Sequence, residues 1–163
     1  MREILDILQA DAHASPERIA SLTGLEADAV RTQIEAWERA GVIRRYKAVV
    51  DVDRLRETSG SDIVSALIDV SVVPLRGVGF EDVASRIARF PEVRSVYLVS
   101  GAQDLRCVVV GRSMHDVADF VAQKLSTIDR ITSTATHFVL KIYKEDGELF
   151  IAPDEDHRLQ VTP

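Results

Sequence analysis

The sequence predicts an α+β protein of two domains, one helical and one built on an antiparallel sheet. Three short amphipathic helix patterns occupy the first forty residues, and a polar stretch that contains Ser-Gly-Ser lies at residues 51–62. After it, apolar runs with strand character alternate with two further helix patterns. Two of these runs, residues 93–99 and 105–110, are separated by a short polar turn, which predicts a central β-hairpin.

The composition is typical of a soluble globular protein. The chain has 163 residues, of which 46% are hydrophobic and 28% charged, and this suits one ordinary domain or two small ones. No apolar run approaches the ~20 residues that span a bilayer, and no signal-peptide core is visible, so we expect a cytoplasmic protein without a membrane partner. The single cysteine, Cys107, lies in an apolar run and is expected to be buried and inert.

The charge balance excludes a generally basic nucleic-acid coat. The net charge is −6, and residues 1–50 hold seven Lys or Arg against eight Asp or Glu. Any affinity for DNA therefore depends on where the charges lie, because phosphate contacts set the salt-dependent part of binding.

Three helices are predicted at the N-terminus, over residues 2–10, from Ser15 to Thr23, and over residues 27–40. Ser15 followed by Pro16 is a strong helix start, and Gly24 suits the left-handed residue that ends a helix. In the third helix, the apolar side chains recur at helical spacing and form one face: Val30, Ile34 and Trp37.

The tight turn at Gly24 predicts a helix-turn-helix, although a plain three-helix bundle with a solvated charged face fits the same pattern. In a helix-turn-helix, the third helix enters the DNA major groove, and Arg31 is the best candidate to contact a guanine edge or a phosphate. Residues 42–50 are predicted as a strand, either a wing against the phosphate backbone or simply an exposed strand. The candidate DNA-binding residues are Ser15, Asp28, Arg31, Thr32, Glu35, Arg44, Arg45 and Lys47.

The second domain is predicted to begin after a polar linker at residues 51–62 and to span residues 63–145. Its order is a strand (63–73), a helix facing inward from Phe80 to Phe90, the hairpin, a helix capped by Ser113, and a strand (132–143). This βαββαβ order is the ferredoxin-like arrangement, with both helices on one sheet face. In the first strand, alternate residues are expected to face the helices: Ala66, Ile68, Val70 and Val72.

The opposite sheet face also carries Val, Leu and Tyr, so we expect it to meet a partner, most simply an identical chain across a two-fold axis. Residues 146–163 form a C-terminal tail. It begins with a turn at residues 145–147 and includes a short edge strand predicted at 158–161.

The segments GVIRRYKAVVD, VYLVSGAQDL and STATHFVLK, on this domain order, resemble the Lrp/AsnC family of bacterial and archaeal regulators over residues 1–145. The resemblance implies a transcription regulator with an N-terminal (winged) helix-turn-helix that binds double-stranded DNA. It also implies a C-terminal domain that forms homodimers, often assembled into octamers, with a small effector, usually an amino acid, between dimers.

The resemblance also implies an effector pocket around the Gly-x-x-Asp turn of the hairpin and part of the last strand. Asp104 would receive an amino group, and backbone amides near Gly101 would receive a carboxylate. The residues carried over are Val99, Ser100, Gly101, Ala102, Gln103, Asp104, Thr134, Thr136 and His137.

The chain departs from the family pattern in three places. It begins directly in the first helix, and Glu26 stands where a serine commonly caps the third helix; Glu is a poorer N-cap, although its charge suits the helix N-terminus. Ala102 and Gln103 occupy turn positions where an aromatic residue often lies, which leaves the identity of the effector open.

No enzyme constellation stands out. The four histidines show no zinc-ligand spacing, and no phosphate-binding glycine loop or nucleophile elbow is present, so we expect no metal, no cofactor and no enzymatic activity. Two alternatives stay open. One is a sensor or assembly protein of this fold without DNA binding, consistent with the near-neutral N-terminal domain. The other is a tetrapyrrole-decarboxylating enzyme, by fold analogy alone, for which we expect no His/Arg cluster.

Overall fold

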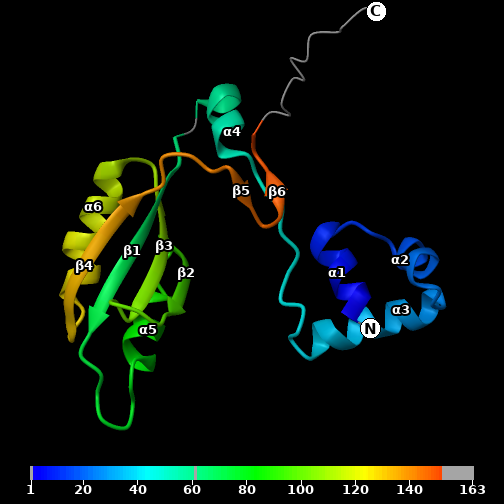
Figure 1. Ribbon diagram of the computed structural model, residues 1–163, viewed down its shortest axis with the longest axis horizontal. Coiled ribbons are helices and arrows are strands. Elements are labelled where there is room, and N and C mark those ends of the chain that lie inside the picture. The colour runs from blue at the N-terminus through cyan, green and yellow to red at the C-terminus, as the bar shows by residue number, and fades with distance from the viewer. Residues whose placement is uncertain (1, 61, 152–163) are drawn as a thin grey trace, which may run out of the picture. The chain divides into compact units, whose positions relative to one another are not determined.

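The computed structural model describes residues 2–60 and 62–151 (Figure 1). The chain divides into two compact units. A helical unit takes Met1–Val50 together with the segment from Lys144 onward, and a sheet unit takes Asp51–Tyr143. In the described part of the chain, no helix is both long and apolar enough to cross a membrane.

Three helices form the helical unit: α1 (Arg2–Ala10), α2 (Pro16–Thr23) and α3 (Ala27–Arg39). All three were predicted, and the predictions are confirmed. The Ser15 Oγ accepts a hydrogen bond from the Arg18 amide at 3.2 Å and so caps α2, which ends at Gly24 with φ 72°. The small core of this unit consists of Ile4, Leu8, Ala14, Ile19 and Val30, with Ile34 and Trp37 packed against it.

The predicted strand at residues 42–50 is wrong, since this segment has no regular secondary structure. Val42 and Tyr46 are exposed, and the Val42 amide bonds back to the Trp37 carbonyl at 2.9 Å, as part of the end of α3. A strand exists only where a neighbouring strand pairs its backbone groups, and apolar alternation alone does not supply that neighbour. Two short strands of the same unit were not predicted from the sequence, β5 (Lys144–Glu145) and β6 (Glu148–Leu149). They pair around the predicted turn at Asp146 and Gly147.

The polar segment predicted as a linker contains a helix, α4 (Val52–Ser59). The Asp51 carboxylate caps it by accepting from the Arg54 amide at 3.0 Å, and Gly60 ends it with φ 64°. No residue of α4 is buried. Helix signals were therefore present at both ends, but the segment lacks the apolar face that amphipathic patterning requires.

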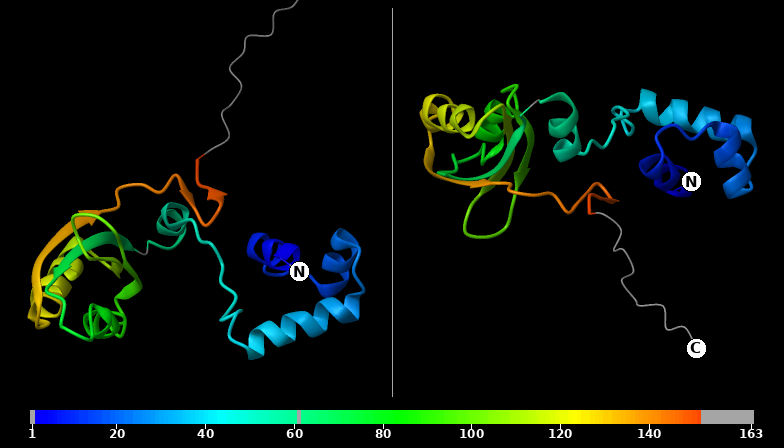
Figure 2. Two further views of the ribbon diagram at one scale, coloured as in Figure 1. Left: turned by 60° about the horizontal axis from the view of Figure 1, so that its bottom comes forward. Right: turned by 90° about the horizontal axis from the view of Figure 1, so that it is seen from above.

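The sheet unit follows the predicted βαββαβ order. Its elements are β1 (Val64–Val72), α5 (Glu81–Ile87), β2 (Val93–Leu98), β3 (Leu105–Gly111), α6 (Met114–Gln123), the short 3-10 helix η1 (Leu125–Thr127) and β4 (Ile131–Phe138). The strands lie in the order β2-β3-β1-β4 and all neighbours are antiparallel. Both helices lie on the same side of the sheet (Figure 2), as predicted.

The core of the sheet unit lies between the sheet and these helices. Ala66, Ile68 and Val70 are fully buried and alternate with outward residues, which confirms the predicted alternation in β1. The rings of Phe90 and Phe120 meet edge to face, with centroids 5.5 Å apart. Gly111 lets α6 approach closely, because a Cβ there would lie 3.1 Å from side-chain atoms of Asp116 and Val117.

The last strand is shorter than predicted. β4 ends at Phe138, which pairs with Ala66, and the Val139 amide still bonds to the Ser65 carbonyl at 2.9 Å. The ladder between β1 and β4 ends there, and Leu140 is 88% exposed. The edge strand predicted at residues 158–161 lies outside the described residues.

Candidate DNA-reading and effector sites

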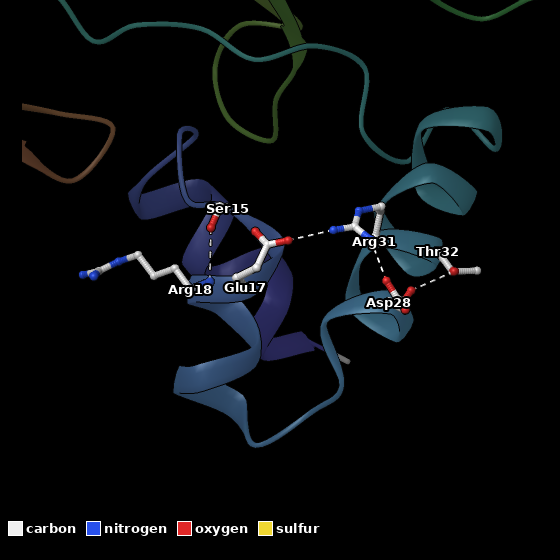
Figure 3. Close-up of polar contacts among 6 residues, drawn as sticks. All are labelled: Ser15, Glu17, Arg18, Asp28, Arg31 and Thr32. Atoms are coloured by element: carbon white, nitrogen blue, oxygen red, sulfur yellow. Dashed lines mark hydrogen bonds and ion pairs between the residues drawn. The ribbon is translucent and has the colours of Figure 1, made fainter.

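Arg31, the predicted reader of DNA, lies on the exposed surface of α3 and is held by two carboxylates (Figure 3). Its Nη1 lies 2.6 Å from Asp28 Oδ1, one turn earlier in α3, and its Nη2 lies 2.7 Å from Glu17 Oε1 in α2. Glu17 was not predicted as a site residue. Backbone hydrogen bonding at the start of α2, then Ser15 and the charge of Arg31, keep the pKa of the Glu17 carboxyl below its usual range.

The other predicted DNA-binding residues of this unit lie around Arg31. Thr32 and Glu35 are exposed on α3, although the Thr32 hydroxyl donates to the Asp28 carbonyl at 2.8 Å (Figure 3). Ser15 is exposed, with its hydroxyl engaged in capping α2. The basic residues after α3 are exposed too, and one of them, Lys47, pairs with Asp146 in the β5–β6 turn.

In the sheet unit, the hairpin turn between β2 and β3 is fastened to the end of β1. The Asp104 amide donates to the Val70 carbonyl at 3.2 Å, and Asp104 Oδ2 accepts from the Val72 amide at 2.8 Å. The Ser71 hydroxyl and Gln103 Oε1 are also hydrogen-bonded. One oxygen of Asp104 therefore organises the turn, and the structure groups the predicted residues 99–104 at this end of the sheet.

The predicted residues from the last strand do not all join this group. Thr134 pairs with Val70, level with the turn. Thr136 pairs with Ile68, two residues further from the turn. His137 pairs with Leu67 and faces the opposite side of the sheet. Within one chain, therefore, the structure separates Thr136 and His137 from the turn.

The sheet face away from α5 and α6, here called the outer face, carries a cluster that was not predicted. Arg106 forms two hydrogen bonds to Asp69, from Nε to Oδ1 at 2.6 Å and from Nη2 to Oδ2 at 2.9 Å. His137 Nε2 lies 3.6 Å from Asp69 Oδ2. The Asp69 residue is only 8% exposed, and the hydrogen bonds from Arg106 hold the pKa of its carboxyl below the usual range.

This cluster corrects the expectation that no His/Arg grouping exists. Strand register brings its three members together from β1, β3 and β4, since Asp69 pairs with both Arg106 and Ala135 while His137 lies two residues further. In the sequence, the one indication of this cluster was Asp69, an acidic residue within an apolar strand. The outer face is consequently mixed in character: the charged cluster lies beside apolar and aromatic residues that include Leu67, Tyr97 and Val108.

A separate hollow of about 540 Å³ lies at the other end of the strands, along α6. Its lining includes Glu92, Arg112, Asp116, Phe120 and Lys124, and the Lys124 ammonium pairs with Glu92. It is distinct from the hairpin turn. Over the portion of the chain that the structure describes, no three side chains of His, Cys, Asp or Glu gather to hold a metal ion.

Models of known families match both units of the chain. Residues 65–149 match the model of the Lrp/AsnC ligand binding domain, and residues 1–44 match a winged helix-turn-helix DNA-binding domain. The chain belongs to the Lrp/AsnC family. The Lrp/AsnC ligand-binding match covers β1 to β6 and includes both the hairpin turn and the outer-face cluster.

Relatives agree with this placement in Lrp/AsnC. The HTH-type transcriptional regulator YugG of Bacillus subtilis (strain 168) is 50% identical over 161 residues, which cover 99% of this chain and 95% of YugG. Among solved structures, Escherichia coli AsnC matches with a TM-score of 0.66 at 23% identity, covering 88% of this chain and 92% of AsnC. A feast or famine regulatory protein from Mycobacterium tuberculosis, complexed with L-methionine, matches with a TM-score of 0.71 at 24% identity, covering 90% of this chain and 94% of its own.

Proposed function

We propose that this Lrp/AsnC chain is a transcription regulator, not an enzyme, in which α3 reads the major groove and the sheet unit binds a small effector. The observation that carries the first half is the placement of Arg31. It stands on the exposed face of the helix that follows the Gly24 turn, within a unit that matches a DNA-binding model. Arginine at this position supplies the donors that bind guanine O6 and N7.

The proposed effector is an amino acid, and its proposed site is the turn at residues 99–104. Gly101 is exposed, and no atom beyond its chain neighbours lies within 4 Å of the position that a Cβ would occupy, which leaves room for a carboxylate beside this backbone. Proteins of the same fold support the ligand class, because solved structures from Neisseria meningitidis and M. tuberculosis are complexes with L-methionine.

The proposed assembly is a homodimer across the outer face, with dimers joining further, up to an octamer. Leu67, Tyr97 and Val108 supply apolar contact there, and the Asp69 cluster supplies polar contacts. Because the effector site lies at the end of the same strands, an effector that binds one assembly state more tightly would shift the population of assemblies. Light scattering during size exclusion, with and without a panel of amino acids that includes L-methionine, measures both the assembly and its response.

The DNA half is tested by enrichment of a random duplex pool, followed by titration of the enriched duplex and a scrambled one. Arg31→Ala should weaken binding of the enriched duplex by roughly 5- to 150-fold, as expected for one base contact. Arg39→Ala, at the exposed end of the same helix, is the matched control. Equal affinities of wild type and Arg31→Ala would remove Arg31 from the site. Failure to enrich any duplex would favour the sensor or assembly protein without DNA binding.

A further inference from the structure

We infer that Glu17 and Asp28 determine DNA specificity by holding the Arg31 guanidinium between them. The inference rests on the proposed function, since it takes Arg31 to be a DNA contact. It adds two acidic residues whose role is to withhold that contact from phosphates and to present it to a base edge.

The geometry supplies the first step. The two carboxylates reach Arg31 from different helices, Glu17 from the start of α2 and Asp28 from the first turn of α3 (Figure 3). Each takes a different terminal nitrogen, at 2.7 and 2.6 Å. The two carboxylates therefore orient the guanidinium plane, which reduces the side-chain freedom that is lost when DNA binds.

The donor count supplies the second step. A guanidinium has five N–H donors, and these two contacts occupy one hydrogen on each terminal nitrogen. The remaining N–H groups can bind a base edge while the carboxylates stay in place. Guanine O6 and N7 are two acceptors at a spacing that suits such a fork.

Charge supplies the third step. With both carboxylates ionised, the cluster of Glu17, Asp28 and Arg31 carries a net charge of about −1. A phosphate approaching Arg31 therefore meets two anions beside one cation, whereas the neutral edge of guanine meets a correctly oriented donor. Like-charge opposition of this kind suppresses wrong partners more than it strengthens the right one.

The inference is specific to these two acids and is not a statement about net charge. Glu3 in α1 is also an exposed acid of the helical unit, and in the described residues Arg31 pairs with Glu17 and Asp28 rather than with Glu3. Glu3→Gln removes the same charge at a different place and is the matched control. Since exposed ion pairs contribute little to stability, Glu17→Gln and Asp28→Asn should both fold.

The experiment measures binding of the enriched and the scrambled duplex by wild type, Glu17→Gln, Asp28→Asn and Glu3→Gln, from about 50 to 200 mM salt. Glu17→Gln should tighten binding of the scrambled duplex by about 3- to 10-fold and reduce the ratio between the two affinities by a similar factor. Asp28→Asn should act in the same direction, while Glu3→Gln should leave the ratio unchanged. The inference would be overturned if the ratio of the two affinities stayed unchanged in both Glu17→Gln and Asp28→Asn. An equal change in Glu3→Gln would overturn it too.

A double-mutant cycle separates this inference from the proposed function. In an Arg31→Ala background, Glu17→Gln should no longer alter the ratio, because the group that it holds is gone. If Glu17→Gln still alters the ratio there, the proposed role of Glu17 and Asp28 is wrong, while the proposal of DNA binding stands. If Arg31→Ala changes neither affinity, the proposed contact of Arg31 with DNA fails, and the proposed role of Glu17 and Asp28 fails with it.

Discussion

The two units keep their charged side chains in different settings. In the helical unit, the Arg31 cluster is exposed, with 48%, 62% and 93% of the side chains of Arg31, Glu17 and Asp28 open to solvent. In the sheet unit, the Asp69 side chain is only 11% exposed and receives two hydrogen bonds from Arg106. Exposed pairs are screened and contribute little to stability, while a desolvated carboxylate needs its partner. We therefore expect a change of charge at the Arg31 cluster to affect stability less than a change at Asp69.

The cores differ in the same direction. Among the residues that the structure describes, twelve form the buried core of the sheet unit and five form that of the helical unit. A chain with one tryptophan and one cysteine allows the two units to be followed separately, because Trp37 lies in the helical unit and Cys107 in the sheet unit. Burial raises the pKa of the Cys107 thiol to about 11, so reaction with a thiol reagent near pH 8 reports opening of the sheet.

The largest expected effect is loss of core volume. Ile68→Ala, in the centre of β1, should lower the free energy of unfolding of the sheet unit by about 2–5 kcal/mol and accelerate labelling of Cys107. Ile19→Ala should lower the free energy of unfolding of the helical unit by a similar amount. Because the core of this unit is smaller, its unfolding followed by Trp37 should stop being cooperative before that of the sheet unit. Urea titration with both probes measures the two effects. Parallel responses of both probes to both variants would show that the units unfold as one.

An intermediate effect is expected at the Asp69 cluster. Asp69→Asn should lower stability near pH 7 by about 1.5–3 kcal/mol, because the Arg106 guanidinium loses its charged acceptor. The folded pKa of Asp69 is depressed, so the stability that its charge contributes is complete above the unfolded value of about 3.9 and is lost as pH falls through the folded value. The difference between wild type and variant should therefore shrink in acid. Urea unfolding at several pH values tests this, and a difference that grows below pH 4 would contradict it.

The smallest expected effect is loss of a helix cap. Ser15→Ala should lower the stability of the helical unit by about 1 kcal/mol, because the Arg18 amide at the start of α2 loses its acceptor. Ser21→Ala, further along α2, removes a hydroxyl that only donates to the Arg18 carbonyl and serves as the control. Thermal unfolding followed by Trp37 fluorescence measures both. Equal shifts for the two variants would mean that Ser15 does not act as a cap.

Local signals predicted local structure well. Ser15, Gly24 and Ser113 were each recognised as helix ends, and each acts as one. The alternation in β1 correctly assigned the buried face. The strand predicted at residues 42–50 failed because pairing depends on a neighbour that the segment itself does not encode.

The same distinction holds for the candidate sites. The turn residues 99–104 are contiguous in the chain, so the resemblance could place them together. Glu17 and Arg31 come from two helices, and Asp69, Arg106 and His137 from three strands, so their contacts depend on helix packing and strand register. Neither contact can be read from spacing along the sequence.

Gly24 sets the handedness of the turn that presents α3. Its φ of 72° belongs to the region that L-amino acids rarely adopt, yet no atom beyond the adjacent backbone lies within 4 Å of the position that a Cβ would occupy. The restriction at this position therefore comes from the local backbone, where a Cβ would crowd the following carbonyl oxygen, and not from a packed neighbouring element. The conformation is the mirror image of an ordinary helical residue, which a D-amino acid adopts without strain. Other residues can adopt a positive φ, as Arg130 does at 77°, but glycine does so without a steric cost and so suits the turn between α2 and α3.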